Sequence, residues 1–269
     1  MEGILFPFFF QYKDYMAKTK RLGSKFLKGQ EIDNMENVAS FKKQKRKPQN
    51  TIGEINIKEI HPLTENQRKV FSAYDDGKNI LSIGSAGTGK SFLFFYLTLF
   101  DLLFSNRYSK IIIFRSAVPT RNIGFLPGNE DEKMSAYTLA YKGICSELLE
   151  RGDGFELLKK KDMIEFQSTS FVRGTTFDNC LIIVEEIQDM NLHEISTLIT
   201  RCGKNTRIFL CGDIKQTDLD PRREVSGIQD FIRIADNMDS FEIVEFGIED
   251  IVRSGLVREY LVAKENLGL

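Results

Sequence analysis

A glycine-rich stretch near the end of the first third of the chain constrains the fold more than any other feature of the sequence. It matches G-x-x-x-x-G-K-[ST] and consists of Gly84, Ser85, Ala86, Gly87, Thr88, Gly89, Lys90 and Ser91. Glycines let the backbone curl until its N–H groups face a phosphate, and a following helix adds unpaired N–H donors and its dipole. In this pattern the lysine brings charge to the outer phosphates, and the last hydroxyl is a ligand for Mg²⁺. The stretch, called the phosphate loop below, therefore predicts a site for a nucleoside triphosphate.

The segments that flank the phosphate loop supply the context that this chemistry needs. Residues 79–83 are predicted to form a short buried strand, and residues 91–104 are an apolar run of helical length. A strand, a glycine-rich loop and a helix in this order are the arrangement in which such loops bind phosphate. A glycine-rich turn without a ligand is the alternative, and both flanks argue against it.

Apolar strands separated by helices recur along the rest of the chain. Predicted strands lie at residues 79–83, 110–114, 163–166, 181–184, 207–211 and 241–246, and predicted helices at 64–76, 91–104, 131–160 with a break near Gly152, 191–201 and 249–265. The strands lack alternation of polar and apolar residues, so both of their faces are expected to be buried. We therefore predict an α/β fold in which a mostly parallel β-sheet is covered by helices on both faces. Ligands of such sheets bind beyond the carboxyl ends of the strands.

The N-terminal segment differs in charge from the remainder. Eleven of the 37 Lys and Arg residues but only five of the 38 Asp and Glu residues lie in residues 1–50, which gives this segment a net charge of +6 and the remainder −7. We predict that residues 1–54 are a basic, largely disordered leader and that residues 55–269 form the compact domain. The leader is either a contact for a polyanion or a solvated tail, and its charge leaves both open.

Few cysteines and histidines argue against several other classes of site. The four cysteines include no C-x-x-C pair and are interpreted as reduced thiols of a cytoplasmic protein. With only two histidines, neither a zinc site nor a Ser-His-Asp triad is expected. The apolar residues 4–10 are too short to span a bilayer, and residues 92–104 are interrupted by polar side chains, so no membrane segment is predicted.

Acidic side chains follow the predicted strand at residues 181–184. A carboxylate at the end of an apolar strand is typical of the position that holds the Mg²⁺ of a bound nucleotide. We assign Glu185 to the metal, directly or through a water molecule, and Glu186 to the water that attacks the γ-phosphate. A pair of acids that merely ends a strand is the alternative, and the upstream phosphate loop favours the functional interpretation.

Polar residues also follow the predicted strand at residues 207–211, in the stretch G-D-I-K-Q-T-D at 212–218. An amide can donate to a phosphate and accept from a water, so Gln216 is the predicted sensor of the γ-phosphate. Asp213 is expected to order this loop or to help hold the metal shell. A turn rich in Gly and Asp without such a role is the alternative.

Taken together, these motifs resemble the PhoH family of P-loop ATPases, which is related to superfamily 1 helicases. The resemblance extends from about residue 61 to residue 261 and rests, besides the phosphate loop, on H-P-L-T-E-N-Q (61–67), F-R-S-A-V (114–118), G-F-L-P-G (124–128), F-V-R-G-T (171–175), E-E-I-Q (185–188), G-D-I-K-Q-T-D-L (212–219) and D-I-V-R (250–253). The motifs other than the phosphate loop are weak alone, whereas their order and spacing are specific. The resemblance implies a RecA-like P-loop NTPase fold, with residues 55–269 as the ATPase domain.

The resemblance also implies roles for four further residues. Gln67 corresponds to the glutamine with which related helicases read adenine, so ATP would be favoured over GTP. The spacing of Thr64 and Gln67 equally fits a capping box at a helix start, and one residue could serve both purposes. Gln188 would lie near the γ-phosphate. Arg173 and Arg253 would contact phosphate, in cis or from a neighbouring subunit, and surface ion pairs are the alternative for both.

The chain departs from the family at one position of the site. The family usually has aspartate where this chain has Glu185, which keeps the charge but moves the carboxylate by the length of a carbon–carbon bond. Metal binding is expected to survive, directly or through water, and turnover is expected to differ.

The resemblance also bears on assembly. Superfamily 1 helicases place ATP between two core domains, and this chain has room for only one after residue 55. ATP would then be half exposed unless a neighbouring subunit covered it. We expect a homo-oligomer in which the neighbour supplies an arginine, and the family resemblance indicates a hexameric ring.

The leading expectation for function is hydrolysis of ATP with Mg²⁺, coupled to binding or remodelling of single-stranded nucleic acid, with RNA favoured over DNA. The basic leader would add a salt-dependent attraction to such a strand. Two alternatives are a slow ATP-dependent switch or binding protein without helicase activity, and a small-molecule phosphotransferase. The phosphotransferase is disfavoured because the sequence offers no clear arginine-rich lid and Glu186 favours water as the acceptor. A GTPase is disfavoured because no guanine-reading N-K-x-D motif follows a late strand.

Overall fold

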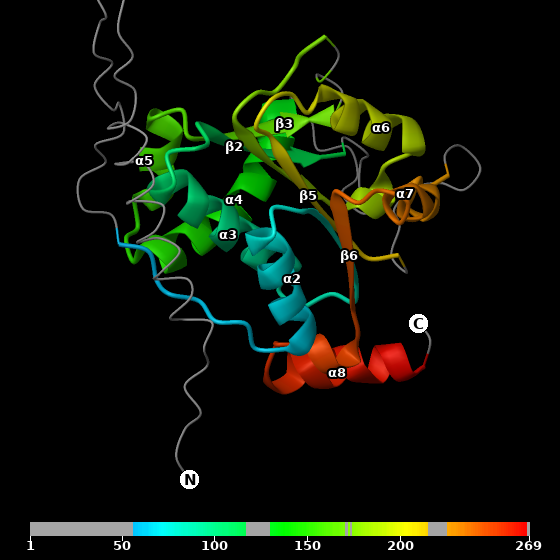
Figure 1. Ribbon diagram of the computed structural model, residues 1–269. Coiled ribbons are helices and arrows are strands. Elements are labelled where there is room, and N and C mark those ends of the chain that lie inside the picture. The colour runs from blue at the N-terminus through cyan, green and yellow to red at the C-terminus, as the bar shows by residue number, and fades with distance from the viewer. Residues whose placement is uncertain (1–55, 117–129, 170–171, 173, 215–224, 268–269) are drawn as a thin grey trace, which may run out of the picture. The chain divides into compact units, whose positions relative to one another are not determined.

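The computed structural model of the chain describes residues 56–116, 130–169, 172, 174–214 and 225–267, and for residues 130–137 it describes the backbone only (Figure 1). The predicted leader, Arg173 and Gln216 lie outside these residues. In the part of the chain that the structure describes, no helix is both long and apolar enough to cross a membrane.

A six-stranded parallel β-sheet forms the centre of the described domain (Figure 1). Its strands are β1 (Asn79–Gly84), β2 (Lys110–Arg115), β3 (Ile164–Ser168), β4 (Cys180–Glu185), β5 (Arg207–Gly212) and β6 (Phe241–Phe246). The order across the sheet is β3-β2-β4-β5-β1-β6, and every pair of neighbours is parallel. Ile83 of β1 pairs with Gly212 of β5, and Val184 of β4 pairs with Leu210 of β5. The carboxyl ends of β1, β4 and β5 therefore meet at one edge of the sheet.

Seven α-helices and two 3₁₀-helices precede, connect or follow these strands within the described residues. The α-helices are α2 (Glu65–Asp75), α3 (Lys90–Phe104), α4 (Glu130–Leu149), α5 (Gly154–Lys160), α6 (Leu192–Arg201), α7 (Ile228–Ala235) and α8 (Gly255–Asn266). The 3₁₀-helices are η2 (Ile187–Asp189) and η3 (Ile248–Asp250).

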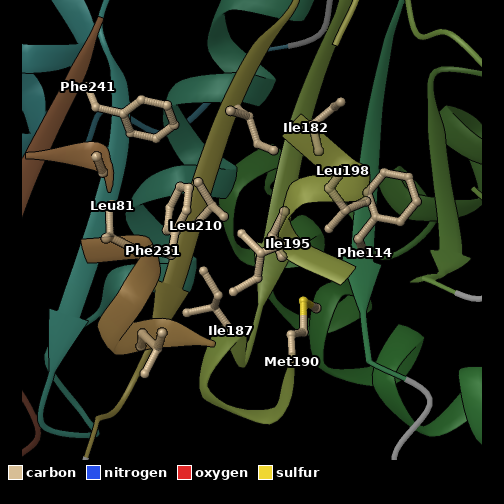
Figure 2. Close-up of a cluster of buried hydrophobic side chains, with 14 of the residues drawn as sticks. Leu81, Phe114, Ile182, Ile187, Met190, Ile195, Leu198, Leu210, Phe231 and Phe241 are labelled. Atoms are coloured by element: carbon tan, nitrogen blue, oxygen red, sulfur yellow. The ribbon is translucent and has the colours of Figure 1, made fainter. Parts of the chain in front are cut away.

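One face of the sheet packs against α6 and α7. Figure 2 shows the buried cluster at this face, to which the strands contribute Leu81, Phe114, Ile182, Leu210 and Phe241, η2 and the residue after it Ile187 and Met190, and the helices Ile195, Leu198 and Phe231. Burial of each such side chain stabilises the fold by about 1.5–3 kcal/mol relative to exposure.

The opposite face of the sheet is covered by α2, α3 and α4. The ring of Phe209 in β5 lies 5.2 Å from that of Tyr74 in α2 and 5.5 Å from that of Phe94 in α3, measured between centroids. The ring of Tyr141 in α4 meets that of Phe95 in α3 at 5.1 Å. Successive strand residues point to opposite faces, so a central strand such as β5 serves both helical layers, with Phe209 on this face and Leu210 on the other. The predicted RecA-like α/β fold is thus confirmed, and the described sheet is parallel throughout.

Side-chain caps fix where two of the helices begin. Asn191 accepts from the Glu194 backbone N–H at the start of α6, and the Glu194 carboxylate accepts from the Asn191 N–H, which completes a capping box. At the start of α2, Thr64 Oγ1 accepts from the Gln67 N–H at 3.3 Å. Gln67 Oε1, however, accepts from the Leu63 N–H at 2.8 Å, so only half of the box predicted there is formed.

Two predictions about the last quarter of the chain are wrong. No helix was expected between the strands at 207–211 and 241–246, whereas α7 lies there and buries Ile228 and Phe231. The single helix expected at 249–265 is divided into η3 and α8 by the non-helical residues 251–254. The backbone N–H of Val252 donates to the Gly87 carbonyl at 3.2 Å, which ties this break to the phosphate loop.

Candidate functional site

The phosphate loop joins β1 to α3 in a conformation that needs glycine. Gly84 has φ of +123°, and a Cβ atom there would overlap the carbonyl group of Phe246 in β6. Gly89 is the N-cap of α3 and has φ of +85°. Side chains are strained in this region of backbone space, whereas glycine enters it freely. The loop therefore turns tightly against the sheet and presents the N-terminus of α3 to the carboxyl edge.

Lys90 lies with its ammonium group inside the curve of this loop. Lys90 Nζ donates to the carbonyl oxygens of Gly84 and Ser85 at 2.7 and 2.8 Å. Burial lowers the pKa of Lys90, and the neighbouring Cys211, Asp213 and two glutamates act in the opposite direction. The Lys90 ammonium group is partly desolvated and is held by neutral acceptors, so it is suited to bind a charged phosphate.

Glu185 is the last residue of β4, and its carboxylate is held in place by hydrogen bonds from three side chains. Oε2 accepts from Ser91 Oγ at 2.8 Å and from Cys211 Sγ at 3.2 Å. Oε1 accepts from the hydroxyl of Tyr141 in α4. Burial raises the pKa of Glu185, while the hydrogen bonds from Tyr141, Ser91 and Cys211 lower it. Burial likewise raises the pKa of both the Tyr141 hydroxyl and the Cys211 thiol far above their usual values, so both remain protonated donors.

Glu186 follows directly in a left-handed conformation, with φ of 51° and ψ of 50°. Its side chain is 38% exposed, and Oε2 accepts from Gln188 Nε2 at 2.7 Å. The guanidinium of Arg115 lies 3.9 Å from Oε1. Gln188 Oε1 in turn accepts from the Asp213 N–H at 3.0 Å, so one amide links the ends of β4 and β5. The sharp turn at Glu186 separates its carboxylate from that of the buried Glu185.

A single pocket of about 830 Å³ joins these groups. Residues 86–91 of the phosphate loop line it together with Glu185, Glu186 and Asp213. The segment before α2 and one face of α4 also line the pocket, through Ile60, His61, Leu63, Ala140, Gly143, Ile144 and Glu147. Lys58 fastens the extended segment before α2 to the end of α4, since its N–H donates to the Leu148 carbonyl at 2.7 Å and its ammonium lies 3.2 Å from Glu147. The pocket thus combines the groups of the phosphate loop with a largely apolar wall, formed by residues 60–63 and the lining face of α4.

Gln67 lines the pocket and contacts both the phosphate loop and the segment before α2. It is 3% exposed, and Nε2 donates to the Thr88 carbonyl of the phosphate loop at 3.0 Å. Through Leu63 on its other side, it connects the wall at residues 60–63 to the loop. Its predicted role as reader of adenine stays a prediction.

Most of the residues singled out in the sequence lie around this pocket. Besides the loop, Glu185, Glu186, Asp213, Gln67 and Arg253 all line it. Gln188 is not among the lining residues of the described chain and lies behind Glu186. The Arg253 side chain lies against the loop, with Cγ 3.1 Å from the position that a Cβ of Gly87 would take. Arg173 and Gln216, being outside the described residues, stay predictions.

Other site residues were not identified from the sequence. Tyr141 and Cys211 donate to Glu185, and Glu265 of α8 accepts from Ser85 Oγ at 3.3 Å. These residues carry no local pattern that distinguishes them from core or surface positions. Only the register of β5, which puts Cys211 beside Ser82 and one residue before the glycine at the strand end, could have pointed to the thiol.

The oxygen atoms available in the pocket fit Mg²⁺ bound together with a nucleotide. Within the described residues, no group of three or more His, Cys, Asp and Glu side chains could hold a metal ion by itself. Mg²⁺ typically takes one or two protein oxygens, substrate phosphates and waters rather than a cage of protein ligands. The hydroxyl of Ser91 and the carboxylate of Glu185 are hydrogen-bonded neighbours of the required hard, oxygen type. Asp213 lies nearby in the same lining.

Comparison with known proteins places this geometry in a family. A family model described as PhoH-like protein matches residues 59–265. A PhoH-like protein of Mycobacterium leprae is 30% identical over 210 residues, which cover 77% of this chain and 58% of that protein. Protein PhoH of Escherichia coli K12 is 30% identical over 204 residues, which cover 74% of this chain and 56% of that protein. The chain thus spans less than two thirds of the length of these relatives.

Among solved structures, the similarity is more distant. The UvsW helicase from bacteriophage T4 has a TM-score of 0.43 and 17% identity, over 72% of this chain and 64% of that one. The large terminase of a thermophilic bacteriophage, in complex with ADP, has a TM-score of 0.45 and 10% identity, over 76% of this chain and 50% of that one.

Proposed function

The chain belongs to the PhoH-like protein family and has a P-loop NTPase fold, and from this premise we propose that it binds ATP with Mg²⁺ in the pocket described above and hydrolyses it. The observation that carries the proposal is the hydrogen bond between Ser91 Oγ and Glu185 Oε2, with Lys90 and Glu186 in the same pocket. A hydroxyl and a carboxylate in contact, beside a partly buried lysine and a second carboxylate, are the parts that phosphoryl transfer to water requires.

The residues would divide the reaction as follows. Lys90 and the backbone N–H groups of the phosphate loop bind and orient the outer phosphates. Ser91 and Glu185 would hold Mg²⁺, which would supply positive charge to offset that of the phosphates. Glu186 accepts a proton from the water as its oxygen bonds to the γ-phosphorus, and the bond from that phosphorus to the bridging oxygen of ADP breaks. ADP and inorganic phosphate are released. The buried Glu185 is held by three donors, which supports assigning it to the metal and leaving the more exposed Glu186 for the water.

We further propose that hydrolysis is coupled to binding or remodelling of single-stranded nucleic acid, with RNA favoured over DNA, in a homo-oligomeric, hexameric ring. The basic leader supports the polyanion partner. Within the described residues a single sheet forms the core beside the pocket, and this supports a site that a neighbouring subunit would complete. A slow ATP-dependent switch without helicase activity is the alternative, and the two functions differ in whether nucleic acid accelerates turnover.

One experiment separates these functions. We expect ATP hydrolysis by the full chain to depend on Mg²⁺ and to be stimulated by single-stranded RNA, less by single-stranded DNA. The apparent affinity for the nucleic acid should fall at least about tenfold between about 50 and 200 mM salt. The measurement is the steady-state rate of phosphate release with each strand and with none. Equal rates with and without both nucleic acids would favour the switch, and GTP hydrolysed as well as ATP would contradict the assignment of Gln67.

The apolar wall of the pocket supports a place for the base of the nucleotide. Ala140, Gly143, Ile144 and Glu147 are spaced as one face of a helix, and they share the pocket with residues 60–63. Ala140 and Gly143 are small, and space is open at the Cβ position of Gly143. A planar base lying against this wall would be held mainly by apolar contact, as in many small-molecule sites.

Filling this space should discriminate base binding from phosphate binding. A Cβ atom at Gly143 would have no other atom within 4 Å, so leucine there enters the pocket rather than the core. We expect Gly143→Leu to weaken ATP at least about tenfold, since it removes apolar contact area from the base, and to leave competition by inorganic tripolyphosphate unchanged. Gly152→Leu is the matched control, because Gly152 also has open space around its Cβ position and does not line the pocket. Unchanged ATP affinity in Gly143→Leu would contradict this position for the base.

A further inference from the structure

Tyr141 reaches the metal-binding end of the site from a helix that the sequence did not connect with it. The ring is 5% exposed and is held edge-on by Phe95 of α3 and Phe166 of β3, at centroid distances of 5.1 and 5.3 Å. With the ring fixed between two neighbours, the hydroxyl has a defined direction, and it donates to Glu185 Oε1.

Because of this hydrogen bond, the two carboxylate oxygens of Glu185 have different partners. Oε1 is engaged by Tyr141, while Oε2 accepts from Ser91 Oγ at 2.8 Å and from Cys211 Sγ at 3.2 Å. Ser91 is the hydroxyl that would share the metal, so Oε2 is the oxygen on the metal side. Glutamate has one more rotatable bond than aspartate and therefore more ways to turn its carboxylate away. A donor on the opposite oxygen removes that freedom.

We propose that Tyr141 is a positioning residue that fixes the Glu185 carboxylate with Oε2 toward Ser91 and the Mg²⁺ of bound ATP. The inference rests on the proposed ATP site. It assigns to Tyr141 a function that goes beyond packing. Glutamate at position 185 is longer than aspartate, and the hydrogen bond from Tyr141 fixes the direction of its carboxylate. Partners that orient a metal ligand commonly change metal affinity by about 10–100-fold when they are removed.

The test is a binding measurement. Tyr141→Phe keeps the ring and its two aromatic neighbours and removes only the donor. With a fluorescent ATP analogue, we expect its affinity in EDTA to equal that of the wild type, and the Mg²⁺ concentration that gives half of the Mg²⁺-dependent gain in affinity to rise about tenfold. Tyr74→Phe is the matched control, because it removes another buried hydroxyl, one that donates to Asp101 at 3.1 Å and does not line the pocket. An unchanged Mg²⁺ requirement in Tyr141→Phe would overturn the proposal.

A second variant tests whether the effect passes through Glu185. We expect Glu185→Asp to bind Mg²⁺–ATP without help from Tyr141, because the shorter side chain draws its carboxylate away from the tyrosine. Tyr141→Phe in the Glu185→Asp background should then leave the Mg²⁺ requirement where Glu185→Asp alone puts it. The same tenfold rise in both backgrounds would show that the tyrosine acts through the fold and would refute the positioning role. If the wild type fails to bind the analogue at all, the proposed function fails, and this outcome is distinct from the others.

Discussion

Lys90→Ala is expected to lower ATP hydrolysis about 100- to 1000-fold and to weaken binding of the nucleotide. The ammonium group is the one positive charge within the curve of the described phosphate loop, and it is partly desolvated, so its attraction for phosphate is less screened than that of a surface lysine. Removal of a single preorganised donor to developing charge has effects of this size in other enzymes. Phosphate release and the ATP-induced rise in melting temperature are the two measurements.

The control for this variant removes the same charge from the surface. Lys69 lies on the exposed side of α2, and Lys69→Ala should leave both measurements unchanged. Because Lys90 also donates to the Gly84 and Ser85 carbonyls, the melting temperature of Lys90→Ala without nucleotide shows whether the loop still folds. A folded Lys90→Ala protein with wild-type turnover would place hydrolysis outside the phosphate loop.

The parts of the fold that were predictable from the sequence are those encoded by contiguous residues. Strands such as β4 and β5 are short apolar runs that are buried on both faces, and the phosphate loop is a contiguous pattern whose glycines have a backbone reason. Glu185 and Glu186 could be found because they follow a strand end directly. In a parallel sheet, strand ends at one edge are brought together by the topology, so local patterns suffice to place them near each other.

Contacts between distant segments could not be predicted in this way. Tyr141 reaches Glu185 across 44 positions of sequence through the packing of α4 on α3 and β3, and nothing in the residues around it distinguishes it from a core tyrosine. Gln188 donates to the Glu186 carboxylate, and this contact depends on the left-handed conformation of Glu186 at the start of η2. The break before α8 similarly depends on a backbone hydrogen bond from Val252 to the phosphate loop.

Glu186→Gln should retain ATP but stop turning it over. The amide has nearly the shape of the carboxylate, and its oxygen can still accept from Gln188 Nε2, which now lies 2.7 Å from Oε2. What the amide lacks is the ability to take a proton from water, and loss of a general base typically lowers the rate by about 100- to 10,000-fold. We therefore expect ATP affinity within about threefold of the wild type, which corresponds to less than about 1 kcal/mol, and a single-turnover rate of hydrolysis at least about a hundredfold lower.

The side chain of Glu186 is the more exposed of the two adjacent acids, and this difference makes their variants separable. Glu185→Gln leaves a neutral amide beside Ser91 and should weaken the Mg²⁺-dependent part of ATP binding, because the carboxylate there is the predicted metal ligand. Glu186→Gln should leave that part intact and act on the chemical step. Glu242→Gln, an exposed acid on β6, is the control for the loss of one negative charge. If Glu186→Gln instead raised the Mg²⁺ requirement and kept its single-turnover rate, the roles assigned to the two glutamates would have to be exchanged.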